Sequence, residues 1–170
     1  DALTILFSES LTGEFKDKFI TFSSRPQFVD LTGAKTLDDK LSILSKYQDV
    51  TNTNIEAVYE LILQASLNLP EEELIDRIVI ISDMEFDQAT VEYSYTRYGY
   101  HEEVHDMDST LELARAKFLE SGIKFPEIVF WNVNSNNSSF PASKFDNVKL
   151  VSGYSSTIIK DIINNESMSP

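Results

Sequence analysis

Residues 101–105 read His-Glu-Glu-Val-His, an H-E-x-x-H pattern. On a helix, two histidines at this spacing bind zinc, and the glutamate acts as the general base of a metalloprotease. Such a helix needs apolar neighbours that bury its back face and a third ligand downstream. Here the pattern lies in a long polar connection with acidic neighbours, so we expect neither protease activity nor a zinc site at His101 and His105.

A second group of chemically capable residues follows the apolar stretch at 77–82. Asp83, Glu85 and Asp87 alternate there, and clustered carboxylates can hold the two Mg²⁺ ions of a phosphoryl-transfer enzyme. The simpler interpretation is a solvated, acidic strand exit. We favour it because nucleic-acid binding needs clustered Lys and Arg, whereas the chain has 28 acids against 14 bases and a net charge of −14.

The composition limits the class of protein further. A chain of 170 residues suits a single domain, which we place at residues 1–164, followed by a disordered tail at 165–170. The absence of cysteine indicates a reducing compartment. No apolar run approaches the ~18 residues of a membrane span, and no secretory leader opens the sequence. We therefore expect an acidic, cytoplasmic (intracellular) protein that binds neither membranes nor nucleic acid.

The spacing of apolar residues predicts alternating helices and strands. The expected helices run from residue 2 to about 12, 37 to 47, 55 to 65, 111 to 119 and 158 to 163. The expected strands are 18–22, 27–31, 77–83, 126–133 and 147–154. The first two strands should form an antiparallel pair, and the other three are apolar on both faces, which is typical of a parallel sheet. The fold class is therefore α/β with a mostly parallel sheet.

Polar residues at the ends of these elements give the expected caps and site. Thr36 is the expected N-cap of the second helix, and Ser109 and Thr110 are those of the fourth. Parallel sheets bind ligands beyond the carboxyl ends of their strands. The turn at 52–54 and Asp83 lie at this edge in the predicted fold.

Tyrosines alternate with polar residues between 93 and 100. As a hairpin, this segment would have one aromatic face. It either folds its rings back onto the domain or forms a partner-binding surface, since exposed tyrosine is enriched at contacts. The candidate interaction residues are Tyr95, Tyr98, Tyr100, His101 and His105. Trp131, by contrast, lies inside an apolar strand, and we expect it in the core.

Five segments of the chain carry a family resemblance. They are GEFKDKFITFSSRPQFVDL, NTNIEAVYELIL, RIVIISDMEFDQA, PEIVFWNV and KLVSGYSSTIIKDI. In this order they resemble the C-terminal von Willebrand factor A-like domain of a largely uncharacterised family found in plants, fungi, bacteria and large DNA viruses. The A-like domain of the Ro RNA-binding protein is more distantly similar. The resemblance covers nearly the whole chain except about 90–108, and it implies a three-layer Rossmann-like fold with one antiparallel edge strand.

The resemblance also implies a metal-ion-dependent adhesion site. In A domains a D-x-S-x-S turn after the first, central strand supplies most ligands, and a threonine and an aspartate from two other loops complete the set. Thr53 and Asp83 match these two positions, and their oxygens suit Mg²⁺. The ligands would then be held in place by Asn52, Ser82 and Glu85, which would not contact the metal themselves. Without a metal, Thr53 would be a helix N-cap or first-turn residue and Asp83 a hydrogen-bond acceptor at a strand end.

The sequence contains neither that first strand nor its D-x-S-x-S turn. The resemblance places the gap inside the sheet, between the strands at 18–22 and 77–83. We expect a copy of the strand, a swapped segment or another chain's edge to fill it, so that self-association through the open sheet is one outcome. The alternative is a sheet that closes directly.

These observations favour a non-enzymatic module that binds a protein partner, through a carboxylate of that partner and an incomplete Mg²⁺ site. The alternatives are a Mg²⁺-dependent phosphoryl-transfer enzyme and a scaffold without metal that binds through residues 90–108.

Overall fold

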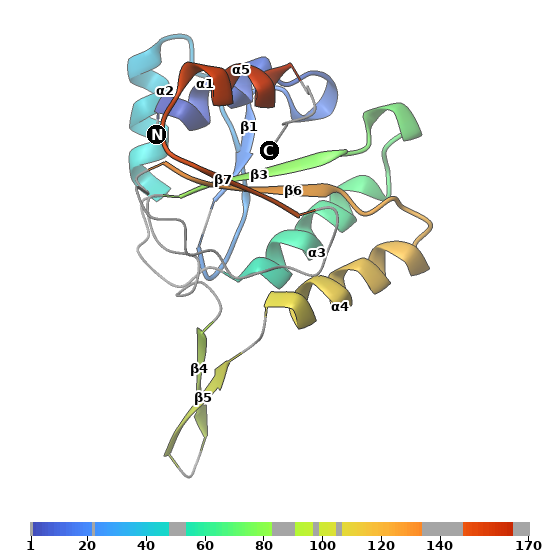
Figure 1. Cartoon of the computed structure of the whole chain (residues 1–170). Coiled ribbons are helices and arrows are strands. Elements are labelled where there is room, and N and C mark those ends of the chain that lie inside the picture. The colour runs from blue at the N-terminus through green and yellow to red at the C-terminus, as the bar shows by residue number, and fades with distance from the viewer. Residues whose placement is uncertain are drawn as a thin grey trace.

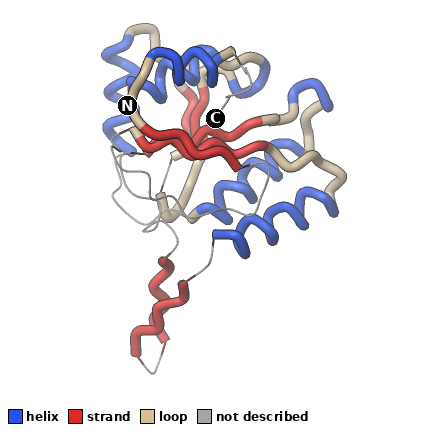
Figure 2. The backbone as a smooth tube through the Cα atoms, viewed as in Figure 1, coloured by secondary structure: helices blue, strands red, loops and turns tan. Residues whose placement is uncertain are grey.

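The computed structural model describes residues 2–21, 23–47, 54–82, 91–96, 99–104, 107–133 and 148–164. They form three layers in which helices cover both faces of a parallel sheet (Figure 1, Figure 2). The predicted α/β class is confirmed, including the parallel sheet and an antiparallel strand pair. The tail expected at 165–170 lies outside the described residues.

The parallel sheet has the strand order β3 (Arg77–Ser82), β6 (Glu127–Asn132) and β7 (Val148–Ser152). Ile128 of β6 lies opposite Ile78 of β3 and Val148 of β7. Every residue of β6 after Glu127 is buried. A strand covered by helices on both faces has no polar side to present, which is why its sequence is a continuous apolar run.

Helices cover the two faces of this sheet (Figure 1). α3 (Ile55–Ser66) and α4 (Met107–Glu120) lie below it as drawn, and α1 (Ala2–Ser10) and α5 (Ser156–Ile163) lie above it. α2 (Leu37–Leu44) lies beside α1. Short 3₁₀ helices occupy Gly13–Phe15, Ser45–Tyr47 and Glu71–Glu73. Throughout the described ranges, none of the helices combines the length and apolarity needed to cross a bilayer.

The main core lies between the sheet and the helices α3 and α4. Ile62 of α3 and Leu111 of α4 belong to it, with 1% and 0% of their surface exposed. An aromatic cluster completes this core: Tyr59 stacks on Phe125 with ring centroids 5.1 Å apart and meets the edge of Phe118 at 6.2 Å. Burying one large apolar side chain contributes about 1.5–3 kcal/mol. This burial, more than helix propensity, holds α3 and α4 in place.

Trp131 anchors the opposite face of the sheet, and the prediction that it belongs to the core is confirmed. Its ring meets Phe7 of α1 edge to face, with centroids 5.9 Å apart. The indole Nε1 donates a hydrogen bond of 2.8 Å to the carbonyl oxygen of Gly153. The tryptophan therefore joins α1, β6 and the segment after β7.

A second, smaller sheet pairs β1 (Lys18–Ile20) with β2 (Phe28–Asp30). The strands are antiparallel, with Phe19 opposite Val29, so the predicted pair is confirmed. Its core is formed by Ile5, Val29, Leu31 and Leu44. In the described part of the chain no strand joins β1 to β3, because β1 bonds to β2 and β3 to β6. Among these residues β1 and β3 are therefore not paired directly with each other. The segment that would lie between them stays a prediction.

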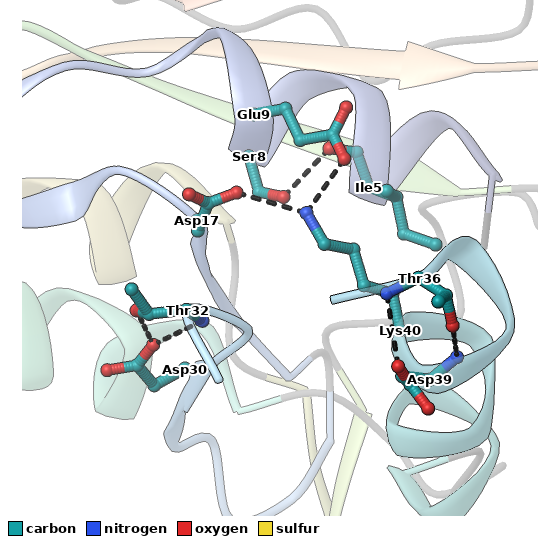
Figure 3. A network of polar contacts seen from close by, with 9 residues as sticks. All are labelled: Ile5, Ser8, Glu9, Asp17, Asp30, Thr32, Thr36, Asp39 and Lys40. Carbon is teal, nitrogen blue, oxygen red and sulfur yellow. Dashed lines mark hydrogen bonds and ion pairs between the residues drawn. The ribbon is translucent and has the colours of Figure 1, made fainter. Parts of the chain in front are cut away.

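Lys40 of α2 joins this helix to α1 and to the turn before β1 (Figure 3). Its ammonium lies 2.7 Å from Glu9 of α1 and 3.2 Å from Asp17 in the turn before β1. The hydrogen bond to Glu9 raises the pKa of Lys40, burial partly opposes this, and Asp17 reinforces it. Asp17 is held at a positive φ of 56° while its N–H donates to the Ser8 carbonyl at 2.8 Å. The turn therefore points its carboxylate towards α2.

The predicted N-cap of α2 is confirmed. Thr36 Oγ1 accepts a hydrogen bond of 3.1 Å from the Asp39 N–H, and the Asp39 carboxylate accepts one of 3.0 Å from the Thr36 N–H (Figure 3). This reciprocal capping box satisfies two backbone donors at the start of the helix. The side-chain hydrogen bond to Thr36 is also the main reason that the pKa of Asp39 is lowered.

The segment before α4 contains a hairpin, and α4 itself begins earlier than predicted. Strands β4 (Val91–Thr96) and β5 (Gly99–Val104) form a hairpin that extends away from the three layers (Figure 1). Residues 101–104 are therefore strand, so the helical spacing that zinc binding needs is absent there. α4 begins at Met107, and the prediction of caps at Ser109 and Thr110 is wrong. Both hydroxyl residues lie inside the first turn of α4, after Met107.

Candidate functional site

A row of polar residues lies where the three parallel strands end. Ser82 of β3, Asn132 of β6 and Ser152 of β7 are direct register partners. Asn132 is 6% exposed, whereas Ser152 is open to solvent. Because α/β sheets bind ligands beyond the carboxyl ends of their strands, this row marks the candidate site.

Helix α3 begins at the same edge. It runs away from this edge and β3 runs back towards it, so that the start of α3 and the end of β3 lie on one side (Figure 1). Asn54 is the N-cap, and its Oδ1 accepts a hydrogen bond of 2.9 Å from the Ala57 N–H. The Asn54 N–H donates to the carbonyl of Ser23 at 3.2 Å. Ser23 is only 8% exposed, so a buried contact ties the start of α3 to the link between β1 and β2.

The ends of β6 and β7 are also tied together. The Gly153 N–H donates to the carbonyl of Asn132 at 2.9 Å, and the Gly153 carbonyl accepts from the Trp131 indole. Gly153 has a φ of +87°, which L side chains rarely adopt. Two residues later Ser155 caps α5 by accepting from the Ile158 N–H at 3.2 Å. The backbone at this edge is therefore rigidly positioned by hydrogen bonds.

The residues predicted to hold a metal are sequence neighbours of Asn54 and Ser82. Thr53 comes one residue before Asn54, and Asp83 comes one residue after Ser82. Thr53, Asp83, Asn52 and Glu85 lie outside the described residues, as does Asp87, and of Ser82 the backbone alone is described. The fold thus brings the neighbours of Thr53 and Asp83 to one edge of the sheet. Among the residues that the structure does describe, no three acidic or histidine side chains gather as a metal site would require.

Three of the predicted interaction residues, Tyr95, Tyr100 and His101, lie in the β4–β5 hairpin. Tyr95 lies opposite Tyr100, and His101 lies opposite Ser94. Tyr98 and His105 fall outside the described residues. The hairpin register brings together Tyr95 and Tyr100, which sequence spacing alone could not do.

A charged cluster occupies the opposite, amino end of the sheet. Glu127 contacts Arg77 at 2.5 Å and Lys149 at 2.7 Å, so that one carboxylate bridges three neighbouring strands. Burial raises the pKa of Glu127, but the hydrogen bonds from Lys149 and Arg77 outweigh this and leave it below the ordinary 4.5. The cluster lies at the other end of the strands from the carboxyl edge. We therefore infer that it stabilises the sheet and is not part of the candidate site.

An open groove of about 610 Å³ runs between α3 and α4. Lys117 spans it, 3.2 Å from Glu56 and 3.4 Å from Glu60. Hydrogen bonding to Gln64, and then to Lys117, lowers the pKa of Glu60. These ion pairs are exposed, and such pairs stabilise a protein by at most about 1 kcal/mol. Beneath them, Tyr59 is 2% exposed and its Oη has no hydrogen-bond partner within the described structure.

Sequence reasoning missed two of the residues that shape the edge. Asn54 and Ser23 fix the start of α3, although only Thr53 was considered as a cap. An asparagine directly before the apolar spacing that begins at Ile55 is a recognised N-cap signal. No sequence signal identifies Ser23, because its role depends on a backbone carbonyl and on a contact with a residue 31 positions away.

The layers and the polar edge define the chain as a three-layer α/β domain with a candidate site at the carboxyl ends of parallel strands. A protein-family model described as "Domain of unknown function (DUF7788)" matches residues 2–170, so the chain belongs to this family.

One curated relative is "Uncharacterized protein L728" of Acanthamoeba polyphaga mimivirus. It is 32% identical over 173 residues, covering 99% of this chain and 28% of the viral protein. The chain therefore spans less than a third of that relative's length. No solved structure matches the chain at a significant level.

Proposed function

We propose that this domain is a non-enzymatic protein-interaction module that binds its partner through a divalent cation. Thr53 and Asp83 supply a hydroxyl and a carboxylate, and an acidic side chain of the partner protein occupies another position on the ion. Mg²⁺ prefers oxygen ligands and keeps several waters, so this donor set fits it. Bound there, the ion supplies a fixed positive charge that attracts the partner's carboxylate.

The observation that carries the proposal is the hydrogen bond from Asn54 to Ser23. It ties the start of α3 to the link between β1 and β2. Thr53 precedes Asn54 and Asp83 follows Ser82 in the sequence, which supports a site shared by these two positions at the edge where α3 begins and β3 ends. The polar row of Ser82, Asn132 and Ser152 supports the proposal, because these three residues are register partners at the ends of the parallel strands.

The proposed relationship is to von Willebrand A-like domains. In such domains the other ligands come from a D-x-S-x-S turn, which these 170 residues do not contain, so the site is proposed to be incomplete in this chain. The separation of the β1–β2 sheet from the β3–β6–β7 sheet supports a further strand between them, from another segment or a second copy. The lack of cysteine supports a cytoplasmic location, because it suits a reducing compartment.

The test is a calorimetric titration of Mn²⁺ and Mg²⁺ into the chain, with and without a short aspartate-containing peptide. We expect uptake of the ion that becomes tighter when the peptide is present, because the peptide carboxylate adds a ligand. Asp83→Asn should abolish this uptake. Asp76→Asn is the matched control: it makes the same change just before the other end of β3, where the carboxylate is exposed and lies 3.6 Å from Lys124.

Two results would overturn the proposal. The first is an Asp83→Asn variant that binds the ions as well as the natural chain does. The second is hydrolysis of a phosphodiester that is lost in Asp83→Asn, because it would assign Asp83, Glu85 and Asp87 to a phosphoryl-transfer enzyme instead.

A further inference from the structure

Two polar stripes line the groove between α3 and α4. These helices lie side by side on one face of the sheet (Figure 1) and share the main core, which holds the stripes opposite each other. Neighbours on one face of a helix are three or four residues apart. The stripes have this spacing and consist of Glu56, Glu60 and Gln64 on α3, and of Lys117, Glu120 and Ser121 on α4.

The groove carries more negative than positive charge. Its ionisable residues are Glu56, Glu60, Glu120 and Lys117. One lysine can balance only one of these three carboxylates, so the groove has an excess of negative charge. The net charge of −14 on the whole chain acts in the same direction. A cationic side chain of another molecule therefore fits the groove better than an anionic or apolar one.

Lys117 shows that the groove stabilises a cation. The hydrogen bond to Glu56 raises the pKa of Lys117, burial partly opposes this, and Glu60 reinforces it. The side chains of Lys117, Glu56 and Glu60 are 45%, 52% and 44% exposed, so another cation can reach both carboxylates from solvent. Exposed ion pairs contribute little to stability, and Lys117 can therefore be displaced at small cost.

A buried hydroxyl lies beneath the groove. Tyr59 lines the narrow space under it together with Glu56, Glu60 and Lys117. Tyr59 is 2% exposed, and its Oη has no hydrogen-bond partner within the described structure. A buried polar group without a partner is unfavourable. A hydrogen-bond donor that enters between α3 and α4 would supply the missing partner.

A guanidinium group has the geometry for these acceptors. It is planar and carries five N–H donors in a fixed fork, whereas an ammonium is a compact point charge. Glu56 and Glu60 are one helical turn apart on α3, and side chains at this spacing begin about 5–6 Å from each other. Ala57 and Leu63 also line the groove and give apolar surface for the methylene stem of an arginine.

We propose that the groove between α3 and α4 binds an arginine side chain in a basic segment of a partner protein. The guanidinium displaces Lys117 from Glu56 and Glu60, donates hydrogen bonds to both carboxylates, and donates a further one to Tyr59 Oη. This contact goes beyond the function proposed above, because it uses a helix face and does not depend on a divalent cation.

The probe is a short synthetic peptide in which arginine alternates with glycine, titrated calorimetrically into the whole chain at low salt. Peptides of the same length with lysine or glutamate in place of arginine are the controls. We expect the arginine peptide to bind, the lysine peptide to bind more weakly and the glutamate peptide not to bind. A chelator and the Asp83→Asn change should leave this binding unaltered, which separates it from the metal titration.

Two pairs of charge variants locate the contact. Glu56→Gln should weaken binding several-fold, whereas Glu112→Gln, which removes the same charge from an exposed residue of α4 outside the groove, should have little effect. Lys117→Gln removes the competing cation and should tighten binding about two- to fivefold. Lys46→Gln is its control, since it removes the same charge from an exposed residue outside the groove.

The hydroxyl of Tyr59 is tested by Tyr59→Phe. We expect this variant to be more stable than the natural protein and yet to bind the arginine peptide about two- to fivefold more weakly, because a hydrogen bond of the complex is lost. Tyr154→Phe changes an exposed tyrosine outside the groove and should bind normally. Thermal unfolding of every variant verifies that the fold is intact.

Four results would overturn the inference. Equal effects of Glu56→Gln and Glu112→Gln would mean general charge attraction without a defined groove. Weaker binding by Lys117→Gln would contradict the displacement of that lysine. Unchanged binding by Tyr59→Phe would exclude the hydroxyl from the contact. Loss of binding on addition of a chelator would assign the peptide to a metal site instead.

Discussion

Replacing Tyr59 by phenylalanine should make the protein more stable. The ring of Tyr59 is held between Phe118 and Phe125, and it is 2% exposed. Its Oη has no hydrogen-bond partner in the part of the chain that the structure describes. Phenylalanine keeps every ring contact and removes only the hydroxyl.

The expected magnitude follows from the desolvation of that hydroxyl. A buried polar group without a partner costs about 1–3 kcal/mol, because the unfolded chain hydrogen-bonds it to water. Tyr59→Phe should therefore raise the free energy of unfolding by about 1–2 kcal/mol. In a protein of this size each kcal/mol raises the midpoint of thermal unfolding by about 2–4 °C.

Urea unfolding followed by circular dichroism measures the change. Tyr154→Phe is the control, because Tyr154 is 70% exposed and its hydroxyl stays in water; its effect should stay within about 0.5 kcal/mol. A Tyr59→Phe variant that is less stable than the natural protein would refute the reasoning, since it would mean that the hydroxyl has a partner whose hydrogen bond is lost.

The pH dependence gives a second measurement. Burial raises the pKa of Tyr59 well above its ordinary 10.0. The unfolded phenol therefore ionises at a lower pH than the folded one, and stability that is present below pH 10.0 is lost as the pH rises further. We expect the natural protein to lose more stability there than Tyr59→Phe does.

Two further predictions concern the caps and the charged cluster. Thr36→Ala removes the capping box with Asp39 and should cost about 0.5–2 kcal/mol in urea unfolding, whereas Thr36→Ser should retain most of the stability; equal losses would assign the effect to the methyl group. The folded pKa of Glu127 is below 4.5, so its pairing with Arg77 and Lys149 stabilises the fold above pH 4.5 and is lost as the pH falls through the folded pKa. Glu127→Gln should therefore be less stable than the natural protein at neutral pH, and the difference should shrink on acidification in a series of unfolding curves; a constant difference would contradict the pairing.

The layers of the fold were predictable because they depend on short-range patterns. The apolar run from Ile78 to Ile81 and the run from Ile128 to Trp131 can be stable only with helices on both sides. Thr36 was recognisable as a cap because its partner Asp39 is three residues away. Signals of this kind involve residues that are only a few positions apart in the sequence.

The rest depends on contacts that local patterns do not encode. The start of α4 at Met107 was missed because three polar residues, 108–110, separate Met107 from the periodic apolar residues that begin at Leu111. The contact between Asn54 and Ser23 joins distant parts of the chain. The proposed ligands Thr53 and Asp83 came from a family resemblance and remain predictions, since the fold positions their neighbours and the structure does not describe them.

The position of Lys40 means that a chemical change at one nitrogen atom would act on three elements at once. Its Nζ is the shared partner of Glu9 in α1 and Asp17 before β1, and the lysine itself belongs to α2. Acylation of that nitrogen would leave two carboxylates near each other without their counter-ion. The contacts of α2 with α1 and with the turn before β1 would then weaken together, whereas the aromatic cluster between α3 and α4 contains none of these residues.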